Sequence, residues 1–139
     1  DPHWIEQFRR YRTYHGCAMP PHHQIASEWV RSDEKHVRDN RARYREKFAA
    51  VMPILTPVLA APSPDAGFYL WPETSIDDET FARQLLQHAG VKVLPGRYLA
   101  RDTATGNPGA HRVRLALVAE LGQCVEAAER IAHAVKSGG

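Results

Sequence analysis

The sequence is poor in cysteine and has no long apolar run, and each absence excludes a class of protein. Its two cysteines, Cys17 and Cys124, are too few and too far apart for the disulfide framework of a small secreted domain. No stretch approaches the roughly 18 apolar residues of a membrane span. Residues 1–4 lack the basic start and apolar core of a signal peptide. We therefore expect a cytoplasmic protein that has no membrane partner.

Motifs for metals and nucleic acids are also missing. The eight histidines include no HExxH motif and no pair four residues apart, and the chain has no CxxC, so we expect no metal site. Cys17 lies near His15, which would suit a nucleophile, but no further residue supports that hypothesis. The helix predicted over 34–51 is basic, but it has interleaved acids and no aromatic stacking pattern. We interpret it as a solvated face and expect no nucleic-acid partner.

The composition indicates one compact domain that begins with helices. The 139 residues are 43% hydrophobic and carry a net charge of +2. The first residue is not Met and a helical pattern begins at once, so we expect the chain to start inside a longer protein. Apolar spacing predicts helices over 3–12, 22–31 and 34–51, with a cap at Ser32 or Asp33. Proline and glycine predict a loop over 13–21 and turns at Pro53 and Pro57.

The apolar periodicity changes after residue 66. Short apolar runs over 67–71 and 91–94, and an alternating run over 111–118, predict three strands. Two more helices are predicted, over 79–89 between a cap at Asp77 or Asp78 and a stop at Gly90, and over 121–136. This order predicts an α/β (α+β) two-layer fold, a small mixed sheet of about three strands covered by helices.

The third predicted strand carries the candidate site residues. Arg112 and Arg114 alternate with Val113 and Leu115, so both arginines lie on one face. An arginine is costly to bury unless an anion meets it. Its planar guanidinium suits a two-point contact with a carboxylate. The alternative is a solvent face with no role, and periodicity alone favours that alternative.

Three segments stand out: 66–71 (Ala-Gly-Phe-Tyr-Leu-Trp), 90–96 (Gly-Val-Lys-Val-Leu-Pro-Gly) and 111–117 (His-Arg-Val-Arg-Leu-Ala-Leu). In their order and spacing they resemble the C-terminal domain of class I, fold-type I pyridoxal-phosphate aminotransferases. In that family an arginine directly before a leucine or isoleucine of the last strand binds the substrate α-carboxylate. The resemblance therefore implies Arg114 as the substrate-binding residue, with Arg112 as a candidate second carboxylate contact.

A narrower resemblance concerns the substrate. Residues 11–16 (Tyr-Arg-Thr-Tyr-His-Gly), 98–101 (Tyr-Leu-Ala-Arg) and 107–114 (Asn-Pro-Gly-Ala-His-Arg-Val-Arg) are similar to the succinyldiaminopimelate transaminases of lysine biosynthesis. This similarity implies amino transfer between glutamate and N-succinyl-2-amino-6-oxopimelate, and the several carboxylates of that substrate would give further arginines a role.

The resemblance also implies pyridoxal 5′-phosphate as cofactor, amino and keto acids as substrates, and a homodimer for the full-length enzyme. It divides the chain into connecting helices from a large domain (1–33) and the small domain proper (34–139). The family's cofactor-binding lysine is missing, because the four lysines of the chain lie outside any matching motif: Lys35, Lys47, Lys92 and Lys136. We therefore expect no catalytic residue in this chain and no activity from it alone.

Two alternatives stay open. One is a non-enzymatic interaction domain that uses the basic face over 38–47 as its contact surface. The other is the small domain of a different fold-type I enzyme, a β-lyase or an aminocyclopropane-carboxylate synthase, because these enzymes use a similar arginine. The upstream reading frame would test the first alternative, and substrate assays would test the second.

Overall fold

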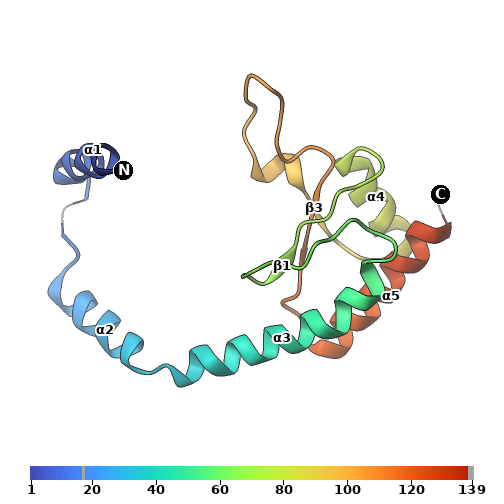
Figure 1. The fold of residues 1–139 in the computed structure, drawn as a ribbon, viewed down its shortest axis with the longest axis horizontal. Coiled ribbons are helices and arrows are strands. Elements are labelled where there is room, and N and C mark those ends of the chain that lie inside the picture. The colour runs from blue at the N-terminus through green and yellow to red at the C-terminus, as the bar shows by residue number, and fades with distance from the viewer. Residues whose placement is uncertain (17, 138–139) are drawn as a thin grey trace. The chain divides into compact units, whose positions relative to one another are not determined.

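A computed structural model describes residues 1–16 and 18–137, so the hypothesis for Cys17 lies outside the described residues. The chain divides into an N-terminal unit (Asp1–Asp39) and a C-terminal unit (Asn40–Gly139). Within the described part, none of the helices combines the length and the apolar character that crossing a bilayer requires. The elements are α1 (Pro2–Tyr14), α2 (Pro21–Ser32), α3 (Lys35–Leu55), β1 (Tyr69–Leu70), α4 (Asp78–Ala89), β2 (Leu94–Pro95), the 3-10 helix η1 (Gly96–Leu99), β3 (Val113–Ala116) and α5 (Leu121–Ser137) (Figure 1).

Local interactions support the two helices of the N-terminal unit. The Asp1 carboxylate caps α1 by accepting the His3 N–H at 2.8 Å. Each helix has a proline in its first turn, where the missing N–H has no helical partner in any case. Neither helix has a buried residue. On α1, Trp4 is 70% exposed and Phe8 61% exposed. A side-chain cap on α1 and local hydrogen bonds within each helix, and not a core, therefore support α1 and α2.

The sheet of the C-terminal unit is built around β3, in the order β1-β3-β2. Both pairings are antiparallel, with Tyr69 opposite Ala116 and Leu94 opposite Arg114. The predicted two-layer fold of three strands and covering helices is confirmed, with an antiparallel sheet in place of the expected mixed one. The physical reason is the position of β3: it separates β1 from β2, so the two strands that run the same way do not pair.

One face of this sheet and three helices enclose the core. Val113 and Leu70 are 0% exposed, and Leu115 is 6% exposed. Side chains alternate along β3, so Arg114 lies on the opposite face and is only half-buried. The helices contribute Val51 and Leu55 of α3, Phe81 and Leu85 of α4, and Cys124, Ala128 and Ile131 of α5.

Several elements differ in length from their predictions. The helix predicted to end near residue 51 continues through Pro53 to Leu55. A proline inside a helix costs roughly 3 kcal/mol, but Val51 and Leu55 are each only 1% exposed, so core burial offsets that cost. The strands are shorter than predicted. Along 91–94 only Leu94 pairs with β3, because the register joins just Leu94 and Pro95 to that strand.

Candidate carboxylate-binding site

The two arginines predicted from the sequence line one pocket of the C-terminal unit. The pocket has a volume of about 630 Å³ and lies on the face of β3 that is turned away from the core. Strand alternation thus brings Arg112 and Arg114 together, as predicted. The other lining residues are Pro62, Ser63, Pro64, Ala66, Tyr69, Trp71 and Leu99.

Arg114 has an unsatisfied hydrogen-bond donor. Its Nε atom is buried, and it is the one such buried side-chain nitrogen or oxygen in the described residues that has no hydrogen-bond partner. Its guanidinium carbon lies 6.0 Å from the centroid of the Tyr69 ring, within reach of a cation–π interaction. That contact leaves the Nε–H donor free. An unpaired buried donor on a charged group is costly, so an acceptor such as a carboxylate oxygen would stabilise this site.

Arg112 differs from Arg114 because protein groups already satisfy it. Its guanidinium forms an ion pair with Glu73 and also donates to the Trp71 carbonyl oxygen at 3.4 Å. The Glu73 side chain is 60% exposed, and an exposed ion pair contributes at most about 1 kcal/mol. Arg112 can therefore exchange this partner at little cost, whereas Arg114 has no such partner to lose.

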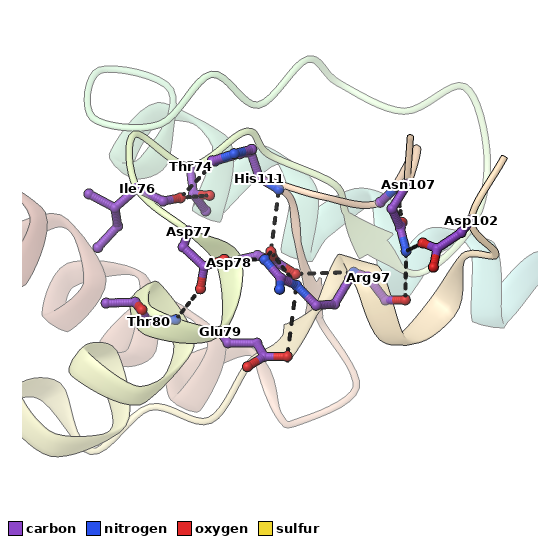
Figure 2. A network of polar contacts seen from close by, with 11 residues as sticks. Thr74, Ile76, Asp77, Asp78, Glu79, Thr80, Arg97, Asp102, Asn107 and His111 are labelled. Carbon is purple, nitrogen blue, oxygen red and sulfur yellow. Dashed lines mark hydrogen bonds and ion pairs between the residues drawn. The ribbon is translucent and has the colours of Figure 1, made fainter. Parts of the chain in front are cut away.

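An ion pair with a buried carboxylate lies beside the chain segment that leads into β3 (Figure 2). Asp78 is 0% exposed and accepts from three nitrogens of Arg97: the backbone N at 3.1 Å, Nε at 2.9 Å and Nη2 at 2.6 Å. Burial raises the pKa of Asp78, but the hydrogen bonds from Arg97 outweigh it and lower that pKa to about 2. Asp77 caps α4 through the Thr80 N–H at 3.1 Å and also pairs with Arg97.

His111 connects this ion pair to β3. Its φ is 57°, in the left-handed region, and it directly precedes Arg112. The His111 N–H donates to Asp78 Oδ1 at 3.4 Å, and its carbonyl oxygen accepts from the Thr74 N–H at 2.8 Å. The sequence predicted a cap at Asp77 or Asp78, and Asp77 is the cap, but the roles of Arg97 and His111 were not predicted. Nineteen residues separate Asp78 from Arg97, so no local spacing signals this contact.

Two glycines bring the backbone close together next to the site. A Cβ atom placed on Gly96 would collide with the Gly109 carbonyl oxygen, and a Cβ on Gly109 would collide with the Gly96 carbonyl oxygen. The Gly96 N–H donates to the Arg112 carbonyl oxygen at 2.7 Å. At the far end of β3, Lys47 Nζ donates to the Leu117 carbonyl oxygen at 3.0 Å. Both ends of the strand that carries Arg114 are thus fixed.

The lysines of the described residues lie away from the arginine pocket. None of the four lysines lines the pocket of Arg112 and Arg114. Lys35 pairs with Asp39 on the surface, and Lys47 is engaged at the end of β3. In the described part of the chain, no group of three histidine, cysteine, aspartate or glutamate side chains is placed to hold a metal ion. The chemistry that the site offers is the binding of an anion.

Comparison with known proteins gives consistent matches. Residues 5–131 match the family described as aminotransferase class I and II. A solved aminotransferase from Neisseria meningitidis is 51% identical, with a TM-score of 0.79 over 96% of this chain and 34% of that one. A probable N-succinyldiaminopimelate aminotransferase from Thermus thermophilus is 34% identical, with a TM-score of 0.64 over 77% of this chain and 28% of that one.

A curated relative points the same way. A probable aminotransferase from Mycobacterium tuberculosis is 34% identical over 116 residues, which cover 83% of this chain and 26% of that protein. The chain thus spans only part of the length of these relatives: 26% of the Mycobacterium tuberculosis protein, 28% of the Thermus thermophilus protein and 34% of the Neisseria meningitidis protein.

Proposed function

The chain belongs to the class I and II aminotransferase family, and from that premise we propose that it forms the C-terminal part of a pyridoxal-phosphate-dependent transaminase. Its role there is to bind the α-carboxylate of the amino acid or keto acid substrate. The observation that carries the proposal is the buried Arg114 Nε, which lacks a hydrogen-bond partner and lies in a pocket with a second arginine.

In this proposal a carboxylate in the pocket pairs with the guanidinium of Arg114. The guanidinium presents parallel N–H donors in a fixed plane, and two of them match the two oxygens of a carboxylate. The Tyr69 ring lies beside the guanidinium, and Trp71 and Leu99 also line the pocket. A contact of this kind fixes the direction in which the rest of the substrate points, and such positioning can supply several kcal/mol of a reaction barrier.

Cofactor binding falls to the rest of the longer enzyme. Pyridoxal phosphate, when bound, supplies the electron sink for amino transfer. The lysines of this chain do not fit its attachment, because none of them lines the pocket. The exposed apolar side chains of α1 and α2 support the division into connecting helices over 1–33 and a small domain over 34–139. This domain division, the homodimer and the cytoplasmic location stay predictions.

For the substrate we propose glutamate and N-succinyl-2-amino-6-oxopimelate. The support is the sequence similarity over 98–101 and 107–114, together with the 34% identity to a probable N-succinyldiaminopimelate aminotransferase. Both arginines have a role in this proposal. Arg114 binds the α-carboxylate, and Arg112 exchanges Glu73 for a second carboxylate of the substrate.

Steady-state kinetics on the full-length enzyme tests the proposal. Truncating one partner of a desolvated arginine–carboxylate pair costs about 2–5 kcal/mol. Arg114→Ala should therefore lower kcat/KM by roughly 30- to 5000-fold. Arg114→Lys should restore little, because an ammonium group cannot reproduce the two-point contact. Arg112→Ala should cost less with glutamate than with the succinylated substrate.

A matched control is Arg130→Ala, because Arg130 pairs with Glu126 on the surface of α5 and lies outside the arginine pocket. That variant should keep its kcat/KM. Near-normal activity of Arg114→Ala with both substrates would contradict the carboxylate role. With a test amino acid that carries a leaving group on Cβ, release of that group together with ammonia and a 2-keto acid, in place of amino transfer, would assign the parent enzyme to the β-lyase type.

A further inference from the structure

His111 has a backbone conformation that needs external support. Its φ of 57° is the one positive value among the described residues other than glycine. In this region the Cβ of an L-residue crowds the following carbonyl oxygen, so only a few per cent of residues other than glycine adopt it, most often asparagine, aspartate and histidine. Such a conformation persists only where the surrounding structure determines it. His111 immediately precedes the two arginines of the site.

The support comes from α4 and from the turn before it (Figure 2). The buried Asp78 accepts the His111 N–H at 3.4 Å, and the Thr74 N–H donates to the His111 carbonyl oxygen at 2.8 Å. The His111 ring contacts the Ile76 carbonyl oxygen through Nδ1 at 3.2 Å. Asp78 is itself fixed by Arg97. The backbone at His111 is therefore held on both sides.

The pairing of β3 begins directly after this residue. The Arg112 carbonyl oxygen accepts from the Gly96 N–H at 2.7 Å, and the Val113 N–H donates to the Pro72 carbonyl oxygen at 3.2 Å. In a strand, a slip of one residue moves every side chain to the opposite face. His111 is thus the last residue before this pairing begins, and its conformation affects how the chain enters β3.

We propose that Asp78 is a positioning residue for carboxylate binding: it holds His111 in the left-handed conformation and so sets the register and place of Arg114. The identity of the ligand rests on the proposed function, but the backbone effect does not. Asp77 provides an internal comparison. It pairs with the same Arg97 and caps α4, but its hydrogen bonds do not include His111.

Two substitutions at His111 test the backbone effect in the 139-residue chain. Glycine adopts a positive φ freely, whereas a β-branched residue resists it. Both His111→Gly and His111→Val lose the ring contact with Ile76, and the exposed ring is not part of the core. His111→Gly should bind glutarate as the unchanged chain does, and His111→Val should bind at least about fivefold more weakly. The probe is the Arg114 Nε–H signal in ¹⁵N NMR, assigned by its loss in Arg114→Lys.

A second pair of variants tests Asp78 itself. Asp78→Asn keeps the shape of the side chain but weakens its bonds to Arg97 and His111, so glutarate affinity should fall several-fold. Asp77→Asn retains a good helix cap and should change the affinity less than twofold. The HN–Hα coupling of His111, measured without ligand, should leave the left-handed range in Asp78→Asn only.

The outcomes separate the two proposals. Equal glutarate affinity in His111→Gly and His111→Val overturns the positioning role, whether or not the Asp78 variant folds. A folded Asp78→Asn chain that keeps the His111 coupling and the Arg114 response also overturns it. If the Arg114 signal of the unchanged chain does not respond to glutarate, the carboxylate site of the proposed function is contradicted. The HN–Hα coupling of His111 still tests the effect of Asp78 in that case, because it is measured without ligand.

Discussion

The N-terminal and C-terminal units use similar helices in different ways. α1 and α5 both have an apolar face, but Trp4 and Phe8 of α1 are 70% and 61% exposed, whereas Ala128 and Ile131 of α5 are 2% and 3% exposed. α5 packs against α4 in its own unit, and α1 has no buried residue at all. An amphipathic sequence therefore specifies which face of a helix is apolar, but not what covers it. The described structure gives only the C-terminal unit a core.

The largest expected difference between the units concerns a core substitution. Leu70→Ala should lower the free energy of unfolding by about 2–5 kcal/mol, because Leu70 is 0% exposed and leaves a cavity in the sheet. Ile5→Ala should change it by less than about 0.5 kcal/mol, because Ile5 is 68% exposed. Urea unfolding of both variants measures the two values. Similar losses at the two positions would show that α1 also belongs to a packed core.

Acid should weaken the C-terminal unit through Asp78. The pKa of Asp78 is lowered from 3.8 to about 2, so its contribution to stability is complete above the unfolded value and is lost as the pH falls from about 4 to about 2. The contribution is on the order of 2 kcal/mol. Asp78→Asn should flatten this part of the pH profile. Urea midpoints between pH 5 and pH 2 give the slopes, and identical slopes would contradict the role of the ion pair.

A smaller effect on the free energy of unfolding is expected from a change in local backbone conformation at the end of α4. Gly90 ends α4 with a φ of 66°, so Gly90→Ala should destabilise the C-terminal unit by about 1 kcal/mol. Gly122→Ala is the matched control, because Gly122 lies in α5 with open space around it and should be neutral or stabilising. Thermal unfolding measures both. A loss at Gly122 as large as that at Gly90 would contradict the conformational explanation.

The smallest effect is expected from deleting α1 and α2. Removal of residues 1–32 keeps Asp33, whose carboxylate accepts the Lys35 N–H at 2.9 Å at the start of α3. The helical signal in circular dichroism should fall. The free energy of unfolding of the remaining chain, measured with urea, should change by less than about 0.5 kcal/mol. A large downward shift would mean that the two units unfold as one and would remove the distinction drawn above.

Local chemistry made part of this structure predictable. The cap at Asp77 and the left-handed Gly90 define α4 almost to the residue, because both signals act within one helical turn. Alternation along β3 correctly placed Arg112 and Arg114 on one face. The two-layer fold followed from the change in periodicity after residue 66.

The remaining features depend on contacts between distant segments. Strand length depends on the partner, so the apolar run over 91–94 forms a pair only at its end. The continuation of α3 through Pro53 depends on the core around Val51 and Leu55. The ion pair of the buried Asp78 with Arg97 joins two helix ends that no local pattern relates. The free donor of Arg114 appears only when the whole pocket is assembled.

The contact between Gly96 and Gly109 has an evolutionary consequence. Each residue occupies the space that a side chain on the other would need, so a change at one position cannot be compensated by a smaller residue at the other. Glycine is already the smallest choice. Correlated substitution, which often rescues a tightly packed pair, has no route here. In a library that varies both positions together, we expect the pair to return as two glycines or not at all.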